Sequence, residues 1–275
     1  MMPELPALAY LPLLAEEFDF GTVREYLFRD TIVQGAKNTL YISVLAQIIG
    51  ILIGTLTAVP RNLKVPVFGQ VCGLYVWFFR GTPLLLQIIF VFSALPLYAP
   101  DDFGFGPFAY HRDWLLLSPF QAALIALALN EGAYMSEIMR AGIESIESGQ
   151  MDAAKSLGMT RLQAMRHVIL PQAARVVVPP TGNEFNAMLK NSSLASVISY
   201  RELLFSARGV YARNYQIMEL LVVASLWYLF FTTVWTLIQG EIEQALRPEE
   251  SQGGMLARLK RAWALPDRWT RSGGT

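Results

Sequence analysis

The sequence predicts an all-α integral membrane protein with about five transmembrane helices. Of its 275 residues, 53% are hydrophobic and only 16% are charged, whereas soluble domains are about 25% charged. Apolar stretches of about 20 residues, the length that spans a bilayer, recur along the chain. Low charge and recurring apolar stretches together indicate that lipid surrounds most of the protein.

Charge divides the chain into three parts. Residues 1–30 are acidic on balance, and we expect this segment to lie outside the membrane without a cleaved signal peptide. Residues 31–246 form the expected transmembrane domain. Residues 247–275 form a basic tail, expected in the cytoplasm, which fits either an amphipathic surface helix or a disordered segment.

The first expected span covers residues 36–59 and is followed by Arg61 and Lys64. Gly50 and Gly54 inside it form a G-x-x-x-G pair, a spacing that lets two helices approach closely. We therefore expect this face to pack against another helix, with a dedicated dimer motif as the alternative.

The second apolar stretch, residues 65–97, is long for a single span. Pro83 should break it near residues 80–83, because proline lacks an N–H group and clashes with the preceding turn. A loop rich in glycine, proline, aspartate and aromatic residues is expected over residues 98–117.

Three further spans are expected: one starting at Ser118, one around residues 176–198 and one over residues 217–238. Pro179 and Pro180 should kink the fourth span. Residues 145–171, between the third and fourth spans, are too polar to cross a membrane.

The orientation follows from lysine and arginine, which favour short cytoplasmic loops. Such residues follow the first span, lie between the third and fourth spans, and fill the tail. With five spans, these regions share one side, so the N-terminus is expected outside and the C-terminus in the cytoplasm. Arg201, Arg208 and Arg213 lie before the fifth span and weaken this bias without reversing it.

Within the polar segment 145–171, residues 148–171 read as two short helices. Gly149 marks a break before the first helix, and Asp152 is expected in its first turn, where a negative charge suits the helix dipole. Gly158 fits the end of this helix, a position that often has positive φ.

The second short helix has its own boundary signals. Thr160 and Gln163 have the spacing of a capping box at its start, and Pro171 should close it. Ala153 and Ala154 give the first helix a small surface that could enter a groove on another protein. The alternative is an ordinary amphipathic loop on the membrane surface.

This segment resembles the coupling loop of ABC importer permeases, whose pattern is Glu-Ala-Ala, three residues, Gly, and then a hydrophobic-Leu-Pro. The match has Asp152 in place of Glu, and its residues are Asp152, Ala153, Ala154, Gly158, Leu170 and Pro171. Residues 80–83, 131–140 and 190–194 also resemble the polar amino acid branch, which includes histidine, glutamine, arginine and glutamate permeases. The resemblance covers about residues 35–246.

The resemblance implies a type I importer permease fold and a division of labour in the bacterial cytoplasmic (inner) membrane. Two permease subunits, identical or related, would form the path, and cytoplasmic ABC ATPases would dock on the six residues of the coupling loop. An extracytoplasmic solute-binding protein would deliver the substrate. The chain has no G-x-x-x-x-G-K-[ST] motif, so ATP would bind to a partner, and we expect neither a cofactor nor an enzymatic activity here.

Charged and amide residues inside the apolar spans are candidates for the substrate path, because an ionisable group costs roughly 2.5–3.5 kcal/mol at the centre of a membrane helix. The candidates are Arg80, Glu131, Asn183, Glu184, Asn186 and Lys190. They could instead pair with one another, cap broken helices or join two subunits. Full charges of both signs favour a zwitterionic amino acid over a sugar.

Other function classes fit less well. The formal net charge is zero, so nothing favours nucleic acid, and Cys72 is the only cysteine, so no disulfide or cysteine-based metal site can form. Neither paired histidine ligands nor a G-x-S-x-G motif indicates an intramembrane enzyme. A self-sufficient channel or secondary carrier is the alternative, although no convincing inverted repeat is visible.

Overall fold

The computed structural model describes residues 18–63, 65–98, 102–103, 110–111, 116–146 and 148–246. The predictions for residues 1–17, for the acidic loop at Asp101 and for the basic tail 247–275 fall outside the described residues. They remain predictions.

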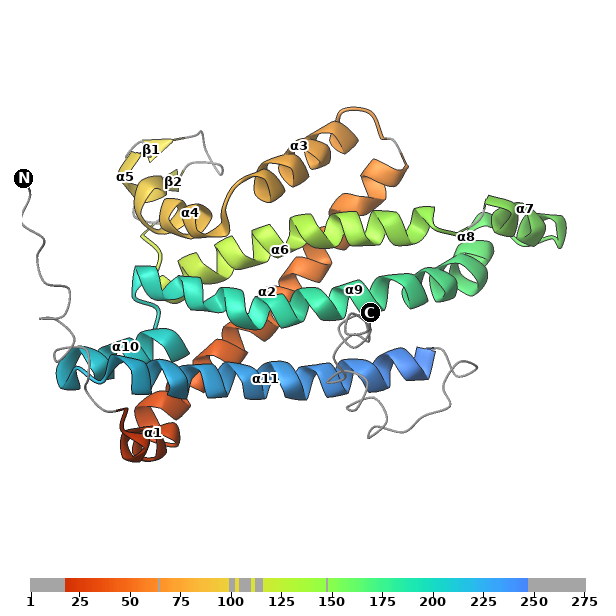
Figure 1. The fold of residues 1–275 in the computed structure, drawn as a ribbon. Helices are drawn as coiled ribbons and strands as arrows, with labels where there is room; N and C mark the ends of the chain where they lie inside the picture. Colours follow the sequence, from red (N-terminus) through yellow and green to blue (C-terminus); the bar gives the residue numbers. More distant parts are fainter. Residues whose placement is uncertain are drawn as a thin grey trace, which may run out of the picture.

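The described chain is built mainly of helices, several of them long enough to cross a bilayer (Figure 1). α2 (Asp30–Asn62) and α11 (Ile217–Leu246) have the length and apolar composition of membrane spans, and α3 (Phe68–Gly81) with the segment Leu84–Ala94 has them as a bent pair. α6 (Pro119–Glu144) is long but interrupted by polar residues. The number of five spans therefore stays a prediction.

The break expected in the second apolar stretch is present. α3 ends before Pro83, α4 (Leu84–Ile89) begins directly after it, and the two helical segments meet at 106°. The side-chain amide of Gln87 donates to the backbone oxygens of Phe79 and Thr82, at 2.9 and 3.1 Å. These bonds satisfy carbonyls that the end of α3 leaves without helical partners.

Beyond the bend, the chain continues through a π-helical turn, η3 (Phe90–Ala94), and the short helix α5 (Leu95–Tyr98). The strands β1 (Asp102–Phe103) and β2 (Tyr110–His111) then pair antiparallel. A loop is expected here from the sequence, so this strand pair is a small addition to the all-α prediction.

α2 and α6 pack closely, and the two glycines of α2 make this possible. A Cβ atom at Gly50 would lie 2.5 Å from Cγ of Glu131, and one at Gly54 would overlap Met135. Larger residues would therefore push the two helices apart. The prediction that the G-x-x-x-G pair serves helix packing is confirmed.

One continuous helical path leads from the polar segment into the bundle. It consists of α8 (Arg161–Ala164), the π-helical turn η6 (Met165–Ile169), α9 (Leu170–Asn191) and the 3-10 helix η7 (Ser192–Ile198). The prediction that Pro171 closes the second short helix is therefore wrong. Pro171 lies in the first turn of α9, where a missing N–H group is tolerated.

α9 also remains helical through Pro179 and Pro180. Thr181 Oγ1 donates to the carbonyl of Val177 at 2.8 Å, and Gln239 Nε2 of α11 donates to the carbonyl of Pro179 at 3.2 Å. The first bond lies within α9, and the second joins α9 to α11 beside the two prolines. The helix is not interrupted, and a kink at this point stays a prediction.

The two ends of the bundle carry different elements (Figure 1). α1 (Phe20–Leu27) and α10 (Leu203–Asn214) lie at one end, and α7 (Ser148–Ser156) lies with α8 at the other. An apolar cluster around Ile32 and Leu220 holds α1, α2, α10 and α11 together. The long helices of the bundle run from one of these ends to the other.

Candidate functional site

Three charged residues predicted for the substrate path meet in one central pocket. Arg80 from the end of α3, Glu131 from the middle of α6 and Glu184 from α9 line an open pocket of about 460 Å³, together with Asn130 and Tyr134. The guanidinium carbon of Arg80 lies 5.3 Å from the centroid of the Tyr134 ring. The pocket presents both signs of charge and an amide, which suits a small ligand that carries an ammonium and a carboxylate.

The position of Glu131 is fixed by α2. Its side chain is buried, Gln47 Nε2 donates to its Oε1 at 2.9 Å, and Gly50 leaves space for its aliphatic stem. Contact between two long helices therefore places this carboxylate at the pocket wall.

The opposite wall is the bend between α3 and α4. Asn130 Nδ2 of α6 donates to the Phe79 carbonyl at 2.9 Å and to Gln87 Oε1 at 3.0 Å. Tyr75 Oη of α3 donates to the Leu129 carbonyl at 2.6 Å. These bonds tie the bend to α6, so Arg80 is held near the two carboxylates.

The other three predicted path residues lie elsewhere on α9. Asn183 Oδ1 accepts a hydrogen bond from Gln239 at 3.3 Å, and Asn186 Nδ2 donates to Thr236 Oγ1 at 3.4 Å, so both contact α11. Lys190 is exposed and does not line the central pocket. The structure brings Arg80, Glu131 and Glu184 together and leaves these three outside.

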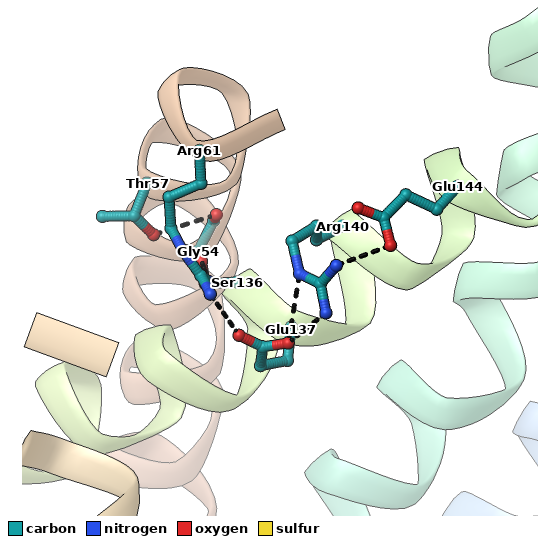
Figure 2. Close-up of polar contacts among 7 residues, drawn as sticks. All are labelled: Gly54, Thr57, Arg61, Ser136, Glu137, Arg140 and Glu144. Carbon is teal, nitrogen blue, oxygen red and sulfur yellow. Dashed lines mark hydrogen bonds and ion pairs between the residues drawn. The ribbon is translucent and has the colours of Figure 1, made fainter. Parts of the chain in front are cut away.

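A chain of ion pairs joins the ends of α2 and α6 (Figure 2). Arg61 Nη2 lies 2.5 Å from Glu137 Oε1, and Arg140 Nη2 lies 2.9 Å from Glu137 Oε2. Arg140 Nη1 also lies 2.5 Å from Glu144 Oε2, and Arg61 Nη1 donates to Ser136 Oγ at 3.1 Å. Glu137 thus pairs with two arginines from different helices.

Sequence reasoning did not identify this chain of ion pairs as a unit. The spacing of Glu137, Arg140 and Glu144 is three and four, which indicates neighbouring charges on one helix face. Arg61, however, is 76 residues from Glu137, and no local pattern links residues so far apart. Arg61 entered only as an indicator of membrane orientation.

Two further hollows extend the central pocket along α6. One of about 400 Å³ shares Arg80 with the central pocket and reaches Arg61 and Glu137; another of about 430 Å³ shares Arg61 and reaches Arg140. We call this series of three hollows the polar line. The polar line presents charged side chains of both signs along its length. Among the described residues, no group of three His, Cys, Asp or Glu side chains could hold a metal ion.

The two short helices of the polar segment are present at the end of the bundle. Gly158 separates α7 from α8 with φ of +83°. Its N–H donates to the Lys155 carbonyl at 2.9 Å, and the N–H of Met159 donates to the Ala154 carbonyl at 3.1 Å. This pair of bonds is the Schellman ending of a helix, so the positive φ predicted for Gly158 is confirmed.

The capping box at the start of the second short helix is also confirmed. Thr160 N–H donates to Gln163 Oε1 at 2.9 Å, and Gln163 N–H donates to Thr160 Oγ1 at 3.3 Å. Leu170 and Pro171, the other end of the matched pattern, are exposed at the start of α9.

Three details of α7 differ from the prediction. Gly149 lies inside the helix, and Asp152 lies past its first turn, because α7 begins already at residue 148. Ala154 is only 3% exposed, since this face of α7 packs on α8 and η6. The outward surface of α7 therefore contains Asp152, Ala153 and Leu157, and Ala154 is not part of it.

Comparison with known proteins gives concordant similarities. Residues 50–248 match the family described as "Binding-protein-dependent transport system inner membrane component". The chain is 40% identical over 220 residues to the arginine transport system permease protein ArgU of Corynebacterium glutamicum. The aligned residues cover 80% of this chain and 69% of ArgU. It is 33% identical over 216 residues to the glutamine transport system permease protein GlnP of Escherichia coli (strain K12), covering 78% of this chain and 93% of GlnP.

A solved structure has a similar fold. The crystal structure of an amino acid ABC transporter with histidines matches with a TM-score of 0.72 and 32% sequence identity. The match covers 82% of this chain and 98% of that chain.

Proposed function

Because the chain belongs to the family of binding-protein-dependent transport system inner membrane components, we propose that it carries a polar amino acid across the bacterial cytoplasmic membrane. It is the membrane-spanning subunit of an ATP-driven importer and has the type I importer permease fold. The named relatives transport arginine and glutamine, which supports an amino acid as the substrate class.

The observation that carries this proposal is the meeting of three charges in the central pocket. Arg80 supplies a guanidinium for a carboxylate, and Glu131 and Glu184 supply carboxylates for an ammonium group. Charge-assisted hydrogen bonds of this kind are stronger than neutral ones. A zwitterion can therefore exchange its water for protein partners inside the membrane.

Release toward the cytoplasm follows the polar line in this proposal. Arg61, Glu137 and Arg140 provide charges of both signs beyond the central pocket. The substrate would pass from one charged group to the next without being left unpaired in a low-dielectric region.

Partners complete the transport cycle. The outward surface of α7, with Asp152 and Ala153, would contact an ABC ATPase that binds ATP. A second permease subunit, identical or related, would form the other half of the path, and a solute-binding protein would deliver the amino acid. We propose the orientation that the sequence predicts, with the N-terminus outside and the C-terminus in the cytoplasm. ATP hydrolysis can then favour one orientation of the pocket over the other, because nucleotide binds the two states differently.

Uptake into vesicles that hold the complete complex tests the proposal. Radiolabelled arginine or glutamine should accumulate with the solute-binding protein on one side and ATP on the other. ATP-dependent uptake of a sugar or an oligopeptide, with no amino acid transported, would refute the substrate class. Uptake by the permease alone, without ATP, would support a channel or secondary carrier instead.

A further inference from the structure

A pocket rich in arginine lies at the end of the bundle far from α7. It has a volume of about 540 Å³ and lies between the corner that joins α1 to α2 and the helix α10. Arg29, Arg201 and Arg213 line it, together with the hydroxyl-bearing residues Thr31 and Ser206, and none of its lining residues is acidic. We call it the arginine pocket.

Two of these arginines have no counter-charge in the described part of the chain. Arg29 pairs with Glu25 at 2.8 Å, whereas Arg201 and Arg213 form no ion pair with any described residue. Both are exposed. Clustered guanidinium groups without acidic partners attract an anion, and their planar donors match the oxygens of a phosphate group.

The arginine pocket lies at the depth of lipid headgroups. α2 has 33 residues, which corresponds to about 50 Å of helix, whereas the hydrocarbon core is only about 30 Å thick. A helix of this length that is centred in the bilayer reaches the headgroup region at both ends, including its start, where Arg29 and Thr31 lie.

Two exposed aromatic side chains lie close in the chain to the arginines of the pocket. Phe28 precedes Arg29 in the chain and is 73% exposed, and Tyr215, two residues after Arg213, is 77% exposed. Aromatic residues at the ends of spans are typical of the membrane–water interface. Arginines at such an interface would lie among the lipid phosphate groups.

We propose that the arginine pocket binds the phosphate-bearing headgroup of an anionic phospholipid. Arg201 and Arg213 would bind the phosphate oxygens, and Thr31 and Ser206 would offer hydroxyl groups to the rest of the headgroup. This occupant also accounts for an anomaly of the sequence, since Arg201 lies two residues before α10 and Arg213 lies in its last turn, on the side that the sequence predicts to be poor in basic residues. An acidic protein surface fits less well, because Phe28 and Tyr215 expose aromatic surface next to the arginines in the chain.

A bound headgroup would join α2 to α10. The two elements already meet through Asn38 Nδ2, which donates to the Arg201 carbonyl at 2.7 Å, and through Gly35, where a Cβ atom would collide with Ser206. A lipid that contacts Arg29 on one side and Arg213 on the other would strengthen this junction. Anionic lipid should therefore stabilise the protein.

The test compares lipid retention by the full transporter complex in nanodiscs. The discs contain either phosphatidylcholine alone or phosphatidylcholine with phosphatidylglycerol, and retained lipid is counted by native mass spectrometry. Each arginine near a membrane surface contributes about 1 kcal/mol, or about fivefold, to the binding of anionic lipid. The variants R201Q and R213Q should each weaken phosphatidylglycerol retention about fivefold, and the double variant should lose it.

Arg208 supplies the matched control, because it lies on α10 and is exposed but does not line the arginine pocket. R208Q should retain phosphatidylglycerol like the wild type, and free glycerol phosphate should not replace the lipid. Equal retention by the double variant and the wild type would overturn the proposal, as would an equal loss in R208Q. Loss of solute-binding-protein affinity in the double variant, with lipid retention unchanged, would assign the arginine pocket to that protein instead.

Discussion

Arg61 of α2 and Glu137 of α6 form an ion pair between two helices, with 2.5 Å between Nη2 and Oε1 (Figure 2). Their side chains are 17% and 21% exposed, so water shields this pair only weakly. Arg140 binds the other carboxylate oxygen of Glu137. Removal of the shared carboxylate would leave Arg61 without an ion-pair partner among the described residues and Arg140 with Glu144 alone, which costs more than the loss of an exposed pair.

The variant E137Q should therefore destabilise the transporter complex more than E144Q does. Glu137 binds arginines from two helices, whereas Glu144 binds only Arg140 and is 50% exposed. Loss of a hydrogen bond to a charged group costs about 1.5–3 kcal/mol, and loss of a surface pair costs less than about 1 kcal/mol. Thermal unfolding of the purified complex checks this order. Equal melting temperatures for the two variants would show that the pair between helices contributes no more than a surface pair.

The central pocket gives a prediction about substrate affinity. Arg80→Gln or Glu184→Gln removes one charge that faces the pocket, and the loss of such a hydrogen bond, about 1.5–3 kcal/mol, corresponds to about tenfold or more in KM. Lys190→Gln is the control, because Lys190 is exposed and lies outside the pocket. Concentration-dependent uptake of radiolabelled arginine or glutamine measures KM. An unchanged KM in both pocket variants would remove the pocket from the substrate path.

The contact between α2 and α6 predicts a steric effect. Gly50→Val should sharply reduce the yield of folded complex, because its Cβ atom would lie 2.5 Å from Glu131 Cγ and overpacking costs about 1–3 kcal/mol or more. Gly73→Val on α3 is the matched control, since a Cβ atom there meets no atom within 4 Å. Size-exclusion chromatography after membrane extraction compares the two. Equal yields would mean that the helices separate at little cost.

Local signals in the sequence predicted the local features of the fold. Pro83 marks the bend, Gly158 marks the end of α7, and Thr160 with Gln163 marks the start of α8, because each depends only on the bonding of neighbouring residues. Pro171 was wrongly predicted to end a helix, because the prediction used only its local sequence. Proline either ends a helix or occupies its first turn, and the sequence alone does not distinguish these two contexts.

Features that depend on distant contacts could not be predicted. Ala154 is buried because α7 folds back on η6, and the residues that meet Glu131 come from three other helices. The polarity of Asn183 and Asn186 is the same whether they face a path or α11. Sequence therefore identified which residues are unusual in a membrane, and only the packing separated pocket residues from interhelical contacts.

The coupling segment predicts two variants in which substrate no longer stimulates ATP hydrolysis. Gly158→Val forces a residue with a Cβ atom into positive φ, at a cost of about 1–2 kcal/mol, and Ala153→Trp adds bulk to the outward surface of α7. Both proteins should insert normally but lose substrate-stimulated ATP hydrolysis in the assembled complex. Gly149→Ala is the control, because Gly149 lies inside α7 with open space around it. Normal stimulation in both variants would remove the coupling assignment.

The orientation of the chain predicts opposite labelling of two exposed positions. Arg208 lies on α10 at one end of the bundle and Lys155 lies on α7 at the other. The distribution of basic residues predicts that α7 lies in the cytoplasm. Single cysteines, Arg208→Cys and Lys155→Cys, are introduced in a Cys72→Ala background, since Cys72 is the only native cysteine. An impermeant thiol reagent applied to intact cells should label position 208 and leave position 155 unlabelled until the membrane is opened. Labelling at 155 but not at 208 would reverse the topology and would place the arginine pocket on the cytoplasmic leaflet.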